Sequence, residues 1–555
     1  MIQIQISGVV YSDRGTAMAN TYDAIVIGGG HNGLVAGAYL AKKGARTLVL
    51  EARDHVGGAA ETSSPWPDAP EFKVTTLSYV VGLVPPSIIR DLQLQRFGYK
   101  LLPQGPYFCP QLDGGALSLA GDHATKAEAI AKFSKKDAQN YFAFKDWIKP
   151  IADVMGPMLM QAPPHLGSKK PMDLLAAGKL GWANRKGLSE RMVANLTKLF
   201  TMSIKDLLDE WLESPVTKVV AGGVSGVIGT WAGPFEPGTA YVMAHHSIGD
   251  IGDVGEMGTW GFAEGGMGAI SDACRKSAEH FGAEVRLNSS VEKVMTRGGA
   301  VTGVVIAGGE ERYAPLVVTA IHPKITFLKH LDKYDLPPDF VSDIENWKTR
   351  SGTVKVNFAV AELPEFTAAP GFNVDVHGGT IELAPTIDYI EQAFIDARSG
   401  KPAEQPFADI SIPTVFDKTL APEGKHIVSM FTQWVPETWA QERNQKELEK
   451  YADRIVDLVT QMAPNFKGSI LHRQVIGPWE MENEWGLIGG NIFHGELSAN
   501  QLFHMRPAPG YADYRSPIRG LYQAHSGTHA GGGVNGIPGH HAVREIMRDK
   551  ALTKK

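Results

Sequence analysis

The chain has 555 residues, of which 43% are apolar and 21% charged, as in ordinary globular proteins long enough for two or more domains. Its net charge of −6, with no basic run interleaved with aromatic residues, argues against nucleic acid as a partner. The two cysteines, Cys109 and Cys274, lie far apart in the sequence and exclude a disulfide framework or a dithiol redox pair.

The first twenty residues have neither a basic start with a long apolar core nor several arginines, so we predict no secretory signal and no mitochondrial presequence. We expect a cytoplasmic protein, with Met18 as a candidate natural start. No stretch approaches about 18 consecutive apolar residues, so we predict no membrane-spanning segment.

The first predicted elements form a nucleotide-binding βαβ unit over residues 22–62. The short run 24–27 predicts a strand buried on both faces, and a helix follows that ends at Gly44. A second strand, Thr47 to Leu50, ends at Glu51, where we expect a ribose hydroxyl to bind.

Three glycines between the first strand and the helix have the G-x-G-x-x-G spacing: Gly28, Gly30 and Gly33. This spacing allows a tight turn, a close approach of backbone to a pyrophosphate and close packing of helix on sheet. We therefore predict that the helix N-terminus meets the phosphates of a dinucleotide.

A second glycine pair, Gly57 and Gly58, completes the pattern E-x5-GG-x3-T with Glu51 and Thr62. This pattern resembles the extended fingerprint of the glutathione reductase-2 type flavoproteins, which include amine oxidases, phytoene desaturases and Rab GDP-dissociation inhibitors. The resemblance implies FAD rather than NAD as the cofactor, with the glycine pair beside its diphosphate.

Apolar residues at helical spacing predict a run of helices from about Lys126 to Leu212. Within it, the interval from Lys169 to Lys198 is rich in cations and carries several leucines and a tryptophan. A basic amphipathic helix of this kind can contact an anionic membrane peripherally, whereas the alternative is a solvated face on a helix packed against the core.

The middle of the chain predicts a return to the nucleotide domain and then a sheet. A helix over 269–281 and a strand over 284–287 precede a hairpin whose turn is at Gly308 and Gly309. Between about 351 and 435, apolar and polar residues alternate, which indicates an antiparallel sheet with one buried face.

Near the C-terminus, Gly531, Gly533 and Gly536 repeat the G-x-G-x-x-G spacing. No second strand and acid follow before Lys555, so we reject a second dinucleotide. A glycine-lined helix N-terminus offers N–H donors and partial positive charge, which suits the flavin N1/O2 edge.

These segments together, with residues 490–539 and the stretch 258–271, resemble the phytoene desaturase-type oxidoreductases over nearly the whole chain from Thr21. Two departures are His525, where glycine is usual, and Ala530, where proline is usual.

The resemblance implies an α/β fold, with a glutathione reductase-2 type, FAD-binding Rossmann-like domain, an antiparallel-sheet substrate domain and a helical cap. The predicted FAD-binding domain comprises residues 21–125, 258–330 and 481–555, the helical cap and substrate region 126–257, and the sheet domain 331–480.

Fingerprint and resemblance together assign seventeen residues to FAD. They are Gly28, Gly30, His31, Asn32, Gly33, Glu51, Ala52, Arg53, Gly57, Gly58, Ala59, Val291, Ala320, Ser526, Gly532, Gly533 and Val534. The resemblance implies that Val291 contacts adenine through its backbone.

Candidates for the chemistry itself are fewer. His525 and His529 flank the predicted flavin edge, where a histidine with a pKa near neutrality moves a proton or stabilises reduced flavin, although packed and hydrogen-bonded histidines are common. Trp260 is a candidate wall of the substrate site, with a core position as the alternative. His245 and His246 lack a further ligand at metal spacing, so we expect no metal.

The leading functional prediction is an FAD-dependent oxidoreductase acting on a small hydrophobic substrate, with polyenes and isoprenoids as candidates, by desaturation, saturation or isomerisation. One alternative is an amine-oxidase-like flavoenzyme, and another is a non-catalytic protein that binds lipids or prenyl groups. The sequence does not identify the electron acceptor.

We expect one FAD per chain, bound non-covalently, because the fingerprint is single and no cysteine or histidine is marked as an attachment site. Denaturation of the purified protein should release about one equivalent of FAD, as one complete βαβ fingerprint implies. Flavin that stays with the precipitated protein would contradict the non-covalent prediction.

Overall fold

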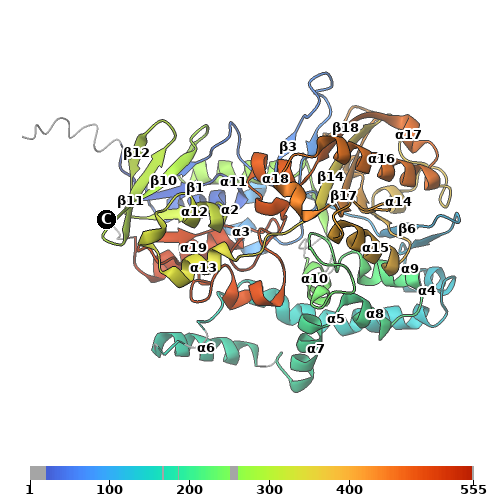
Figure 1. Cartoon of the computed structure of the whole chain (residues 1–555), viewed down its shortest axis with the longest axis horizontal. Coiled ribbons are helices and arrows are strands. Elements are labelled where there is room, and N and C mark those ends of the chain that lie inside the picture. Colours follow the sequence, from blue (N-terminus) through green and yellow to red (C-terminus); the bar gives the residue numbers. More distant parts are fainter. Residues whose placement is uncertain (1–19, 166–167, 170, 186, 250–259, 553–555) are drawn as a thin grey trace, which may run out of the picture.

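The structure is a computed structural model that describes residues 20–165, 168–169, 171–185, 187–249 and 260–552. It contains two large sheets, which lie toward opposite ends of the long axis (Figure 1). Met18 and the start of the stretch 258–271 lie outside the described residues.

The first sheet has five parallel strands collected from three distant parts of the chain. In spatial order they are β19 (Leu521–Gln523), β13 (Val317–Thr319), β1 (Ala24–Ile27), β2 (Thr47–Leu50) and β9 (Glu284–Arg286). Strands β1, β2 and β13 are buried at every position, as expected for a parallel sheet covered on both faces.

Alternate residues of β1 face two different hydrophobic cores. Ala24 and Val26 pack with three helices, α2 (His31–Lys42), α11 (Gly268–His280) and α19 (Ile537–Arg548). Ile25 and Ile27 pack with the opposite layer.

That opposite layer is a three-stranded sheet with two short helices. It consists of β10 (Val291–Arg297), β11 (Ala300–Ile306), β12 (Glu310–Tyr313), α12 (Pro323–Leu328) and α13 (Pro338–Glu345). Strands β11 and β12 form the predicted hairpin, and Gly308 and Gly309 have φ values of +89° and +84° in its turn. The hairpin prediction is confirmed.

The second sheet has seven strands. In order they are β18 (Ile470–Ile476), β14 (Thr353–Val360), β17 (His426–Gln433), β16 (Phe407–Ser411), β15 (Thr380–Leu383), β6 (Tyr107–Pro110) and β7 (Ala116–Ser118). All neighbouring pairs are antiparallel except β15 and β6, which are parallel.

The seven-stranded sheet differs from the prediction in two ways. Its members β6 and β7 come from the segment assigned to the first part of the FAD-binding domain. Its central strands are buried on both faces rather than one, because the alternate polar positions, such as Lys355 and Asn357 on β14, face other parts of the protein and not solvent.

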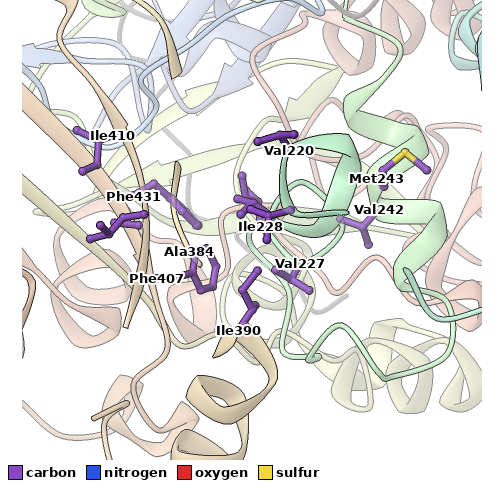
Figure 2. Close-up of a cluster of buried hydrophobic side chains, with 14 of the residues drawn as sticks. Val220, Val227, Ile228, Val242, Met243, Ala384, Ile390, Phe407, Ile410 and Phe431 are labelled. Atoms are coloured by element: carbon purple, nitrogen blue, oxygen red, sulfur yellow. The ribbon is translucent and has the colours of Figure 1, made fainter. Parts of the chain in front are cut away.

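One face of this sheet contributes to the largest hydrophobic core. Helices α15 (Ile387–Arg398) and α16 (Gln445–Met462) belong to the same core as the sheet. Figure 2 shows Val220, Val227 and Ile228 with sheet residues such as Phe407 and Phe431 on one side and Val242 and Met243 on the other.

Helices dominate residues 123–246, which include the run predicted from about Lys126 to Leu212. They are α4 (His123–Ala131), α5 (Asp137–Leu159), α6 (Pro171–Asn184), α7 (Glu190–Thr201), α8 (Ile204–Asp209), α9 (Pro215–Lys218) and α10 (Thr239–His246). Most pack along the lower edge of the molecule in Figure 1. Before these helices, the segment 85–125 contains a short helix, α3 (Pro86–Asp91).

Helix α6 stands apart from the body of the molecule (Figure 1) and exposes Leu174, Leu175 and Trp182. Membrane contact through this region stays a prediction. Among the described residues, no helix is long and apolar enough to cross a membrane.

Helix α15 offers a matched test of the large core, because Ile390 is fully buried and Ile395 is 39% exposed on the same helix. Ile390→Ala should lower the free energy of unfolding by about 2–5 kcal/mol through lost burial and an unfilled cavity. Ile395→Ala should change it by less than about 1 kcal/mol. Urea unfolding at saturating FAD measures both, and equal effects would place Ile390 outside the core.

Candidate functional site

Two adjoining cavities lie between the parallel sheet and the seven-stranded sheet. The first, called here the nucleotide cavity, is lined by the βαβ fingerprint, by 320–325, by 484–487 and by His494, His525 and Ser526. The second, called here the apolar cavity, is lined chiefly by apolar side chains. The two share five residues: His31, Ala59, Leu487, His494 and Ser526.

The fingerprint folds into an open helix N-terminus at the nucleotide cavity. Helix α2 follows Gly30, and no described side chain caps its first turn, so backbone N–H donors remain available there. Gly28 has φ = +100°, which favours glycine. A Cβ on Gly33 would lie 2.0 Å from the Gly28 carbonyl oxygen, so only glycine allows this packing.

Glu51 lies at the end of β2, as predicted, and lines the nucleotide cavity. Its carboxylate accepts hydrogen bonds from the Gly29 N–H (2.7 Å) and the Arg53 N–H (3.0 Å). The Arg53 guanidinium forms an ion pair with Glu61 at 2.6 Å. Glu51 therefore fixes the glycine-rich turn while it remains at the cavity wall.

Hydrogen bonds join the C-terminal segment to the fingerprint. Asn32, on the first turn of α2, donates to the Ser526 hydroxyl at 2.9 Å, and both side chains are buried. Gly533 and Val534 line the apolar cavity together with Ser526. Ser526 thus lies where the two cavities meet, and Gly533 and Val534 extend the wall of the apolar cavity.

A buried arginine holds this region in place. The Arg506 guanidinium donates to the carbonyl oxygens of Phe493, Ser526 and Thr528, at 2.5, 3.0 and 3.2 Å. It has no carboxylate partner among the described residues and lies 5.2 Å from the centre of the Trp347 ring. Burial lowers the pKa of Arg506 to about 10, so it stays charged at neutral pH.

Four histidines gather at the nucleotide cavity: His31, His322, His494 and His525. The ring centres of His494 and His525 are 4.4 Å apart, and those of His322 and His525 are 5.6 Å apart. One ring nitrogen in each of His31, His322 and His494 is buried and has no partner within the described part of the chain.

These histidines are neutral at physiological pH. Burial lowers the pKa of His31 to about 4 and that of His494 to about 3. Burial and the neighbouring His494 and His322 lower the pKa of His525 well below its usual range. The expectation of a near-neutral pKa at His525 is therefore wrong, because the sequence does not show how deeply the ring is buried.

Some predicted residues lie outside both cavity linings. His529 is buried, and its Nε2 lies 3.2 Å from the Met158 carbonyl oxygen of α5, so the structure gives it a packing contact instead of a place at the reaction site. Burial lowers its pKa to about 4. Val291 packs in the core beneath β1, and Gly33 and Gly532 lie behind the walls.

The other predicted cofactor residues line one or both cavities. In the nucleotide cavity these are Gly28, Gly30, His31, Asn32, Glu51, Ala52, Arg53, Gly57, Gly58, Ala59, Ala320 and Ser526. The sequence reasoning missed His322 and His494, for which no local pattern existed. It also missed the aromatic contribution of Trp485 in α18 (Pro478–Trp485).

Trp260 lines the apolar cavity, and its indole N–H donates to the His246 carbonyl oxygen at 3.1 Å. Tyr79 and Phe431, stacked with ring centres 6.1 Å apart, form another wall. Among the described residues, no three metal-binding side chains come together.

The nucleotide cavity fits FAD chemically. An uncapped helix N-terminus suits a diphosphate, a carboxylate at the end of β2 suits a ribose, and unpartnered histidine nitrogens can exchange hydrogen bonds with a polar ring edge. A flavin held in the nucleotide cavity would lie beside the apolar cavity, because the two cavities share a wall.

Comparison with known families agrees with this geometry. Residues 26–81 match the NAD(P)-binding Rossmann-like domain, and residues 235–536 match the flavin containing amine oxidoreductase family. Pyridine nucleotide-disulfide oxidoreductase domain-containing protein 2 of Rattus norvegicus is 38% identical over 97% of this chain and 96% of its own length.

Two further similarities are more distant. A lycopene-forming phytoene desaturase of Paracoccus sp. is 24% identical over 94% of this chain and 97% of its own length. The crystal structure of a putrescine oxidase variant has a TM-score of 0.58 and 17% identity, covering 96% of this chain and 99% of that one, which shows a common fold.

Gly533 allows a test of whether the C-terminal segment contacts the flavin. Gly533 has φ = +108° and an added Cβ would lie 2.8 Å from Leu83 Cδ1, whereas Gly424 has φ = +73° and open space around it. Gly533→Ala should lower FAD occupancy. Gly424→Ala should lower the free energy of unfolding by about 1 kcal/mol through backbone strain and leave FAD occupancy unchanged. Flavin absorbance per folded protein measures occupancy. Equal, wild-type-like occupancy in both variants would show that the segment around Gly533 does not contact the cofactor.

Proposed function

The chain belongs to the flavin-containing amine oxidoreductase family, whose cofactor is FAD, and on this premise we propose that it transfers hydride between FAD and a largely apolar substrate held in the apolar cavity. The observation that carries the proposal is the wall shared by the two cavities. A compound in one would lie against a flavin in the other.

The composition of the cavity supports an apolar substrate. Its lining includes the aliphatic and aromatic side chains of Leu77, Val80, Ile228, Phe431, Ile492 and Phe493. Such walls favour hydrocarbon and exclude water from the reacting atoms. Figure 2 shows that Ile228 and Phe431 are continuous with the large hydrophobic core, so this part of the wall is fixed by packing.

FAD, when bound, supplies the redox chemistry by accepting or donating a hydride. The protein's own residues position the substrate and the cofactor. The neutral histidines beside the nucleotide cavity hold polar groups by hydrogen bonds without adding charge. Arg506 adds a fixed positive charge behind the segment 526–528.

A polyene or isoprenoid substrate, converted by desaturation, saturation or isomerisation, is the finer proposal. It is supported by the apolar walls and by the similarity to a protein named phytoene desaturase. The similarity to a putrescine oxidase supports the fold alone, and an amine substrate is the less favoured candidate because lysines offset the carboxyl groups of the cavity. A protein purified without flavin would instead favour a binding role.

Filling the apolar cavity should separate substrate binding from cofactor binding. Ile228→Trp places an indole in the cavity, whereas Ile395→Trp adds one at an exposed position. We expect anaerobic reduction of the bound flavin by apolar olefins to slow by roughly ten-fold or more in Ile228→Trp, in line with the energetic cost of a misfitted apolar pocket. FAD content should stay unchanged.

Anaerobic bleaching of the flavin absorbance, with a panel of olefins of increasing length, measures this rate. A rate equal to that of Ile395→Trp would show that substrate does not occupy this cavity.

A further inference from the structure

One wall of the apolar cavity includes Phe431, Asp409 and Glu382, which belong to a row of residues across the seven-stranded sheet. Strand register places Lys355 opposite Phe431, Phe431 opposite Asp409, and Asp409 opposite Glu382. We call Lys355, Phe431, Asp409 and Glu382 the buried row. All four side chains are at most 7% exposed.

Two carboxyl groups of the buried row, those of Glu382 and Asp409, line the apolar cavity and have unused hydrogen-bonding capacity. Tyr79 donates its hydroxyl to Asp409 Oδ2 at 2.9 Å, but Asp409 Oδ1 has no partner in the described part of the chain. Glu382 is 3% exposed, and its Oε2 likewise has none there. A buried carboxyl oxygen without a hydrogen bond is costly, so its retention at a cavity indicates a ligand.

The groups around Glu382 and Asp409 do not favour the binding of a cation. Lys355 donates a hydrogen bond to Ser429, and its Nζ lies 4.5 Å from the centre of the Tyr79 ring. Lys355 interacts electrostatically with Asp409, and the half-buried Lys145 of α5 interacts in the same way with Glu382. The other titratable groups that Glu382 influences are Tyr79, Tyr107, Tyr141 and Cys109, all neutral. Two acids and two amines carry no net charge when two of the four groups hold a proton.

The protonation states agree with a balanced cluster. Burial raises the pKa of Glu382 well above its usual range and that of Asp409 to about 6. Burial lowers the pKa of Lys355 to about 7 and that of Lys145 to about 8. An added ammonium group would bring an unpaired charge into a buried site. A neutral hydrogen-bond donor would satisfy an unpartnered carboxyl oxygen without the free-energy cost of burying that charge.

We propose that Glu382 and Asp409 form a subsite for a hydroxyl group at one end of an otherwise apolar substrate, whose reacting carbon lies toward the flavin. Tyr79 shows how far this subsite lies from the shared wall. The preceding residue, Ser78, donates its N–H to the Ala59 carbonyl oxygen at the wall, and the Tyr79 hydroxyl donates to Asp409. About the length of a tyrosine side chain therefore separates the acid pair from the wall. This inference rests on the proposed function.

The test measures binding of three matched probes to the FAD-loaded protein by equilibrium dialysis: 1-octanol, its methyl ether and octylammonium. The ether retains the oxygen of octanol but has lost its donor, so the ratio of ether Kd to octanol Kd reports donor recognition. Octanol should be the tightest-binding of the three. The ratio should fall by about ten-fold in Glu382→Met, the value of one hydrogen bond to a carboxyl group.

Two further variants complete the design. Glu382→Gln keeps an acceptor oxygen and should retain part of the preference. Glu391→Met removes a carboxyl group that is similarly buried, at 8% exposure, but lies outside both cavities, and should retain the full preference. A ratio unchanged in Glu382→Met, or tighter binding of octylammonium than of octanol, would overturn the proposal.

The flavin absorbance spectrum, recorded with each probe, separates this proposal from the proposed function. A spectral change on binding without preference for the donor overturns the subsite and leaves the function intact. If octanol is preferred over its ether in a manner that depends on Glu382, but the flavin spectrum does not change, the subsite is supported and the apolar cavity does not adjoin the flavin. Absence of binding by all three probes overturns both.

Discussion

The site depends on one buried guanidinium. Around Arg506, residues 493–498 and 526–528 lie outside the helices and strands that would satisfy their carbonyl groups, and the arginine donates to carbonyl oxygens of both segments. Its charge is offset by these dipoles and by the face of Trp347, since no described carboxylate pairs with it. Removal of the arginine would leave several buried acceptors unpaired, at a cost of about 1–3 kcal/mol for each. His494 and Ser526 owe their positions at the shared wall to this constraint.

Burial then sets the chemistry that the site can perform. The four histidines of the nucleotide cavity are neutral because burial lowers their pKa values, and in His322, His494 and His525 a neighbouring histidine and Arg506 lower the pKa further. They therefore bind and orient polar groups, and they are poor proton donors at neutral pH. This suits hydride transfer, in which the cofactor carries the electrons and the protein supplies position and a dry environment.

The seven-stranded sheet explains how an apolar cavity acquires a polar wall. In a sheet with one solvated face, alternate polar residues would meet water, but here the outward positions of β14, β16 and β15 face the site instead. Lys355, Asp409 and Glu382 consequently lie in one buried row, with Phe431 between Lys355 and Asp409. Substrate selection can then depend on a single polar contact in otherwise apolar surroundings, which discriminates more strongly than hydrocarbon packing.

The sequence by itself determined the βαβ unit, its glycines, Glu51, the hairpin at Gly308 and Gly309 and the run of helices after residue 123, because each pattern depends on residues within a few positions of one another. It also indicated FAD, since the fingerprint is local. Only the tertiary structure decided that β6 and β7 join the second sheet, that its polar face is buried, that His322 and His494 meet His525 while His529 packs against α5, and that Glu382 lies opposite Asp409. Those facts depend on strand register and burial between segments far apart in the chain, which no local pattern of residues encodes.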